Sequence, residues 1–194
     1  TAADLELSHD GGLLYEKSRA ATLGDVDAFV SHSWTDPAES KWNALQAWGS
    51  GWGPGPRTVW LDKACIDQSQ VHENLAGLPV FISGCQTMVV LVGPSYPSRL
   101  WCCVELFVYA RLRSDPLVAM LLDHSLALEP LLRSFDAELC KCTDARDRER
   151  LLAVVETGFG TLDGFNAYVR RCFIDALMAS PSRRIEEELS GPQL

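Results

Sequence analysis

One acidic side chain, Glu105, lies within an apolar helical pattern and is the first candidate for chemistry in this sequence. Glu105 follows Trp101 by four residues, so both side chains lie on one face of the helix that apolar spacing predicts over residues 100–112. Ionised carboxylates rarely lie in such surroundings without a partner or a function. Glu105 is therefore either the acid of a site or half of an ion pair with Arg99 or Arg111, and the local pattern alone favours the ion pair.

A second group of reactive side chains, Ser31–Asp36, stands between a predicted strand and a predicted helix. Its hydroxyls, imidazole and indole at a helix N-terminus suit an anionic group such as a phosphate. Ser33, Thr35 or Asp36 could equally cap the helix, and capping is compatible with binding. A serine hydrolase with His32 as its base would need a nucleophile elbow, and the sequence contains no Gly-x-Ser-x-Gly.

Acidic side chains also follow the second predicted strand, where Asp62, Lys63 and Asp67 could bind a ligand or remain solvated. Solvation is the commoner outcome for such a segment. The glycines within residues 51–55 match neither the dinucleotide-binding nor the Walker pattern, and they precede a strand where a phosphate loop would follow one. We therefore interpret these glycines as connectors.

The composition predicts a single soluble domain that does not bind nucleic acid. A chain of 194 residues with 47% hydrophobic and 22% charged residues suits one ordinary globular fold. A formal net charge of -9 without a Lys/Arg stripe argues against a nucleic-acid surface. No apolar stretch is long enough for a transmembrane helix and the first residues lack signal-peptide features, so we expect no membrane contact by this domain, although a larger parent could carry membrane segments.

The seven cysteines are an odd number scattered through mostly apolar surroundings. This distribution is typical of reduced thiols in a cytoplasmic protein. No Cys-x-x-Cys pair or zinc-type histidine spacing is present, and Cys140 and Cys142 lack a second ligand pair. We therefore expect a cytoplasmic location, no disulfide and no metal.

Short apolar runs alternate with helical patterns along the central part of the sequence. Strands that are apolar along their whole length imply a parallel sheet with helices on both faces, which is a doubly wound α/β fold. Ligands bind such sheets beyond the carboxyl ends of the strands, where the segments after Ser31, Leu61 and Val92 would meet. A fifth strand is not evident. The predicted strands are 26–31, 58–61, 87–92 and 117–122, and the predicted helices are 42–48, 75–85, 100–112, 144–156 and 162–178.

Motifs over residues 24–123 resemble, in order and spacing, those of the Toll/interleukin-1 receptor (TIR) domain family. The most specific is the family's Ser-x-x-x-Trp-Cys-x-x-Glu-Leu, which this sequence matches from Ser98 only with a shortened lead, Ser-x-x-Trp. The resemblance implies a flavodoxin-like parallel sheet of four to five strands, with a mobile loop after the second strand, here residues 63–73. The motifs are Asp27–His32, Val59–Asp62, Val89–Val92 and Ser95–Leu106. The expected divisions are an N-terminal arm (1–23), the α/β domain with extra C-terminal helices (24–179) and a C-terminal tail (180–194).

Catalytic TIR domains cleave NAD+ to nicotinamide and ADP-ribose or a cyclic form, and the resemblance assigns their required glutamate to Glu105. Breaking the bond between ribose and nicotinamide develops oxocarbenium character, which a nearby carboxylate can stabilise. Nicotinamide leaves as a neutral base, so no second acid is required. The resemblance thus implies an NAD+ nucleosidase that takes NAD+ as substrate and needs no further cofactor. It also implies substrate-binding roles for Phe29, Ser31, His32, Trp101 and Asp62, with residues 62–67 closing over the pocket.

Many TIR domains act only as adaptors that join one another to pass a signal, so a non-catalytic adaptor is the alternative function. The acidic net charge would suit a basic partner face, and a homo-oligomer or a complex with other TIR domains is the expected assembly. A flavodoxin-like nucleotide or phosphoacceptor domain is a third, weaker hypothesis, because Asp62 has no accompanying acidic cluster. The sequence departs from familiar TIR domains at His32–Trp34 and Cys102–Cys103, which affects the expected adenine and phosphate contacts.

Overall fold

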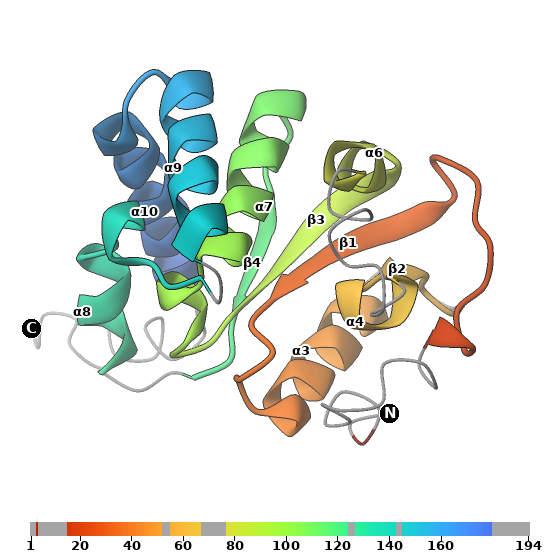
Figure 1. Ribbon diagram of the computed structural model, residues 1–194. Helices are drawn as coiled ribbons and strands as arrows, with labels where there is room; N and C mark the ends of the chain where they lie inside the picture. Colours follow the sequence, from red (N-terminus) through yellow and green to blue (C-terminus); the bar gives the residue numbers. More distant parts are fainter. Residues whose placement is uncertain are drawn as a thin grey trace, which may run out of the picture.

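The computed structural model describes residues 3, 15–51, 55–66, 77–123, 127–142 and 145–179. Its centre is a four-stranded sheet in the order β2-β1-β3-β4, and each pair of neighbouring strands is parallel (Figure 1). This confirms the predicted doubly wound α/β fold, and the strand order is consistent with flavodoxin-like topology. The strands are β1 (Val26–His32), β2 (Val59–Trp60), β3 (Cys85–Val92) and β4 (Val118–Leu121).

Helices cover both faces of the sheet. On one face, α3 (Ala38–Ser50) packs Trp48 against Val30 and Leu91. The other face carries the larger core, built with α6 (Leu78–Ser83), α7 (Leu100–Leu112), α9 (Ala145–Phe159) and α10 (Leu162–Ala179). The remaining short helices are α4 (Asp62–Cys65), η1 (Tyr96–Ser98), α8 (Leu128–Arg133) and η2 (Ala137–Leu139). None of the helices in the described ranges has the length and apolar character needed to cross a membrane.

The segment after β2 departs from the sequence prediction of a loop from residue 63. Helix α4 begins at Asp62 because the chain turns back on itself, with the N–H of Cys65 donating to the carbonyl of Leu61 at 2.8 Å. The rest of the predicted loop, residues 67–76, lies outside the described residues. Helix α6 is shorter than the predicted helix 75–85, with Pro79 in its first turn, since Cys85 already begins β3.

Helix α7 is held at both ends by hydrogen bonds to other elements. At its start, the N–H of Leu100 donates to the carbonyl of Lys141 at 3.0 Å, and the N–H of Lys141 donates to the carbonyl of Ser98 at 2.7 Å. Beyond its end, the guanidinium of Arg113 donates to the carbonyls of Cys85 and Gln86 at 3.1 and 2.8 Å. The direction of α7, and of the side chains it carries, is therefore fixed relative to β3.

Candidate functional site

Five side chains gather where β1, β2 and β3 end and α7 begins, because parallel strands bring their carboxyl ends to one edge of the sheet. The first two come from β1, the third starts α4 and the last two come from η1 and α7. We name this group the strand-end site. Its members are Ser31, His32, Asp62, Tyr96 and Glu105.

The carboxyl group of Glu105 is hydrogen-bonded to a serine and not to an arginine. Glu105 is only 9% exposed, and its Oε2 accepts a hydrogen bond from the Oγ of Ser31 at 2.5 Å. Neither Arg99 nor Arg111 forms an ion pair with it in the described part of the chain. The ion-pair prediction is therefore wrong. The strand that ends at His32 presents Ser31 to α7, and its hydroxyl is the partner that Glu105 has instead.

Tyr96 extends the contact from Glu105 into the core. Its hydroxyl lies 2.7 Å from the Oγ of Ser31, and both side chains are fully buried. When Ser31 donates its single proton to Glu105, Tyr96 acts as the donor to Ser31. Burial, with the nearby Cys102 and Glu105, raises the pKa of the Tyr96 phenol well above its usual value, so the phenol stays protonated. Tyr96 is a member of the site to which the sequence analysis assigns no role.

The surroundings of Glu105 favour its neutral form. Burial raises the pKa of Glu105 well above the ordinary value, and the negative charge of Asp62 raises it further. The hydrogen bond from Ser31 acts in the opposite direction, because it stabilises the carboxylate. The net result is a raised pKa, so deprotonation of Glu105 requires an alkaline shift, a cationic ligand or greater exposure to water.

Asp62 is already occupied by protein groups. Its Oδ2 accepts a hydrogen bond from the indole Nε1 of Trp34 at 2.7 Å, while its Oδ1 lies 3.1 Å from the Nε2 of His32 and 2.6 Å from the N–H of Lys63. Burial opposes its ionisation, but the imidazole of His32 and these hydrogen bonds together lower the pKa of Asp62. Asp62 therefore orients His32 and Trp34, with the indole 39% exposed beside it.

The other nitrogen of His32 has no hydrogen-bond partner among the described residues. Its Nδ1 is buried, and the side chain is only 2% exposed. Buried polar nitrogens are usually paired, so an unpaired one marks a position where a ligand atom or a water molecule can bind. Of the described side chains in the site, His32 thus retains an unused polar atom.

Two residues with expected substrate-binding roles do not join this polar group. Phe29 is fully buried in the core, where its ring stacks on that of Trp60 at 4.6 Å between ring centres. Trp101 is half-buried on α7, one turn before Glu105. The structure thus brings together Ser31, His32, Asp62 and Glu105, while Phe29 belongs to the packing beneath them. The predicted closing segment reaches only Ile66 within the described residues.

A hydrogen-bonded lock joins the loops that follow β1 and β3. The Oδ1 of Asp36 accepts hydrogen bonds from the N–H and Oγ of Ser95 at 2.9 and 2.7 Å. The N-cap of α3 is Pro37, and α3 has no side-chain cap, so the prediction that Ser33, Thr35 or Asp36 caps this helix is wrong. Asp36 serves the neighbouring loop instead, and its carboxylate makes the start of α3 unfavourable for a phosphate.

A buried lysine supports the same loop from below. The Nζ of Lys41 donates to the carbonyls of Ser33 and Trp34 at 3.0 and 3.3 Å, and the side chain is 1% exposed. Burial lowers the pKa of Lys41, while the charge of Asp36 partly offsets this effect. Lys41 therefore fixes the backbone that carries Trp34. The helical spacing around Trp42 does not reveal this role, because a lysine on α3 reads as a solvated residue.

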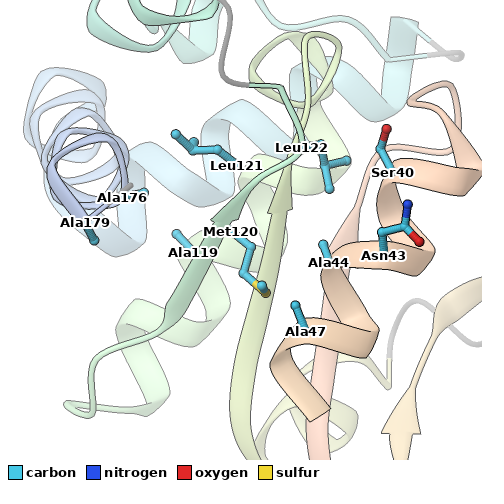
Figure 2. Close-up of a pocket in the computed structure, with 10 residues that line it drawn as sticks. All are labelled: Ser40, Asn43, Ala44, Ala47, Ala119, Met120, Leu121, Leu122, Ala176 and Ala179. Carbon is cyan, nitrogen blue, oxygen red and sulfur yellow. The ribbon is translucent and has the colours of Figure 1, made fainter. Parts of the chain in front are cut away.

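Glu105 does not line the groove found between α3 and the β4 edge of the sheet. A groove of about 500 Å³ lies between α3, β4 and α10, and its lining is mostly apolar (Figure 2). It lies on the β4 side of the sheet, away from β2 and α4, which carry Asp62. The strand-end site and this groove, which we name the β4 groove, are therefore separate regions of the molecule.

Fold and site define a doubly wound α/β domain with a buried carboxyl group near the carboxyl ends of its strands. No protein-family model matches the chain, and neither a curated protein nor a solved structure does. The resemblance to TIR domains therefore rests on the sequence motifs and on their placement in this fold.

Proposed function

We propose that this domain is an NAD+ glycohydrolase of the TIR type, with Glu105 as its catalytic residue. The observation that supports this most is the position of Glu105 at the carboxyl ends of the strands, bound to the hydroxyl of Ser31 and without a cationic partner in the described residues. Carboxyl groups with strongly raised pKa values are enriched at functional sites. An acid paired with an arginine would have supported a purely structural role.

In the proposed reaction, the bond between ribose C1′ and the nicotinamide nitrogen breaks, and its electron pair leaves with nicotinamide. The remaining ribosyl group carries positive charge, which the Glu105 carboxylate stabilises. Water then adds at C1′ and releases a proton, which gives ADP-ribose; attack by a ring nitrogen of the adenine would give a cyclic product instead. In this reaction the Nδ1 of His32, which is buried and has no hydrogen-bond partner among the described residues, would contact a polar group of the substrate once the site opens.

The mechanism requires Glu105 to be ionised, although its surroundings favour the neutral form. Two features can supply this change. The positive charge of the nicotinamide ring would lower the pKa of Glu105 on binding, and displacement of the cover over Glu105 would reduce its desolvation. The proposal therefore includes a rearrangement around Ser31 when NAD+ enters, in a domain that works in the cytoplasm on NAD+ without a metal.

Nicotinamide release from NAD+ by the purified chain at high protein concentration tests the proposal. Glu105→Gln keeps nearly the same shape and can still pair with Ser31, so we expect it to fold normally and to lose release by at least about a thousandfold. Glu156→Gln, an exposed change of the same charge on α9, should leave release unaltered. Unchanged turnover in Glu105→Gln would contradict the assignment, provided that both variants unfold at the same temperature as the parent protein.

A non-catalytic adaptor is the second candidate, and the burial of Glu105 favours it. A 9% exposed acid with a raised pKa is a poor stabiliser of positive charge unless the site opens. This function predicts self-association, or association with other TIR domains, without nicotinamide release. Light scattering beside the release assay distinguishes the two, because only the hydrolase shows turnover that depends on Glu105.

A further inference from the structure

Strand β4 forms an edge of the sheet, and no strand within the described residues pairs with its outer side. It is the last strand in the order β2-β1-β3-β4, and the described segments after it are helical. The N–H of Leu122 donates to the carbonyl of Val92 on β3. Since successive N–H groups of a strand point to opposite sides, the N–H and C=O groups of Ala119 and Leu121 point away from β3. An edge of this kind is a template for another strand.

The β4 groove provides space for that strand. Figure 2 shows Met120 and Leu122 on the α3 side of β4, and Ala119 and Leu121 on the α10 side. Small side chains form both walls, so the side chains of an added strand would find room on either face. The walls are Ser40, Asn43, Ala44 and Ala47 on α3, and Ala176 and Ala179 on α10.

The chemistry of the groove restricts its occupant to an extended segment that is apolar on both faces. Sheet edges are commonly protected by a charged residue, a proline or a bulge, and residues 117–122 contain no charged residue and no proline. Among the described strands, β1 and β3 are interior and β2 spans two residues. The strand β4 itself therefore meets the requirement. It is uncharged, apolar on both faces, and paired on one side only among the described strands.

We propose that a second copy of this chain docks here, with the two β4 strands pairing antiparallel about a twofold axis at Met120. This register sets Ala119 opposite Leu121 of the second copy, and each such pair exchanges both of its backbone hydrogen bonds. A small side chain then meets a large one on the α10 side, while the two Met120 side chains meet on the α3 side. The product is a continuous sheet of both copies.

The charges at the two ends of β4 favour the antiparallel arrangement. Arg111 and the Arg113–Asp115 ion pair precede the strand with a net positive charge, and Asp123 follows it with a negative one. Antiparallel pairing brings the positive end of each copy to the negative end of the other, whereas parallel pairing would place like ends together. This surface does not involve Glu105, so the proposal holds whether or not the domain cleaves NAD+.

Light scattering across a range of protein concentrations tests the dimer. Ala47→Glu places a charge on an exposed wall of the groove, and we expect it to raise the dimer dissociation constant at least about tenfold. Gln46→Glu adds the same charge to the next, exposed residue of α3, outside the groove lining, and should leave association unchanged. A monomeric parent protein at every concentration, or equal effects of the two variants, would overturn the proposal.

Cysteine cross-linking tests the register. Met120→Cys should form a disulfide between copies under mild oxidation, because the twofold axis places this residue opposite itself. Val118→Cys lies on the same face of β4 but opposite Leu122 of the second copy, so it should not link above the background of the native thiols. Equal linking of both variants would overturn the register, and a dimer that forms only after deletion of residues 180–194 would assign the groove to that segment instead.

Discussion

The strand-end site and the β4 groove differ in how far their polar groups are hydrogen-bonded within the chain. In the strand-end site, Ser31, Asp62 and Glu105 bond to other groups of the same chain, and a nitrogen of His32 is the polar atom left over. Along the β4 edge, mostly apolar side chains line an open groove beside backbone with which no described strand pairs. The polar groups of the strand-end site, where the sequence motifs predict chemistry, are therefore mostly paired within the chain. The β4 groove, to which no motif assigns a function, is open to a partner.

The largest expected effects separate the two regions. Glu105→Gln should remove nicotinamide release by at least about a thousandfold while leaving the dimer dissociation constant unchanged. Ala47→Glu should have the opposite pattern: it should raise the dimer dissociation constant at least about tenfold and leave nicotinamide release unchanged. Nicotinamide release and the dimer dissociation constant should be measured on both variants. If one variant changes both quantities, the two regions are not independent, and the catalytic pocket would form only in the dimer.

The next effect tests the close packing under the strand-end site. A Cβ at Gly93 would lie 2.4 Å from the carboxylate of Asp36, so Gly93→Ala should lower the free energy of unfolding by about 1–3 kcal/mol. Gly49→Ala on α3 is the control, because its Cβ would meet the Cγ of Arg57 at 3.8 Å, which is an ordinary van der Waals contact. Urea denaturation measures both, and equal stabilities would show that the Asp36 lock yields without cost.

A smaller effect tests the contact between Tyr96 and Ser31. Tyr96→Phe removes one buried hydroxyl without changing the ring, and we expect a loss of about 1 kcal/mol in the free energy of unfolding. Nicotinamide release should fall much less than in Glu105→Gln, because Ser31 can still bond to Glu105. Tyr15→Phe, at a 46% exposed ring, should change stability by less than about 0.5 kcal/mol.

The smallest effect is on pH dependence. Because the pKa of folded Glu105 lies above its unfolded value, the stability contributed by the neutral acid is present at low pH and is lost as pH rises through the folded pKa. Release, which needs the carboxylate, should rise over the same range. Asp62→Asn removes a charge that raises this pKa, so both midpoints should move to lower pH.

Ionisation of Asp62 affects stability in the opposite direction, in the acid pH range. Its pKa is lowered on folding, so its contribution is present at neutral pH and is lost as pH falls through the folded value. Thermal unfolding of Asp62→Asn across the acid and alkaline ranges should show both changes. Asp115→Asn, at an exposed side chain paired with Arg113, is the control and should shift neither midpoint of the alkaline range.

The sheet could be predicted from the sequence because its strands are short runs that are apolar along their whole length, such as residues 87–92. Boundaries are harder to predict where two tendencies compete. Cys85 follows a helical pattern but pairs with Val26 in the sheet, so β3 begins there. Helix α8 was invisible to periodicity because it has only six residues and contains Pro130. Strand pairing and packing with distant residues set these boundaries, and the local sequence does not show them.

For the site, the sequence predicted which strand ends meet but not how their side chains bond. Glu105, Ser31, His32 and Asp62 do lie together, because parallel topology places them so. The partner of Glu105 could not be predicted, since arginines and serines are both within reach along the sequence. Phe29 could not be assigned to the core from its type alone, because alternation in a strand buried on both faces gives no direction.

Helix α7 is attached at both ends, to Lys141 at its start and to the first residues of β3 beyond its end, so the backbone that carries Glu105 is held in place. Because it is held at both ends, α7 forms the fixed side of the strand-end site. In the proposed function, an opening over Glu105 would therefore have to come from the short helix that starts at Asp62, since Lys41 holds the backbone at Ser33 and Trp34.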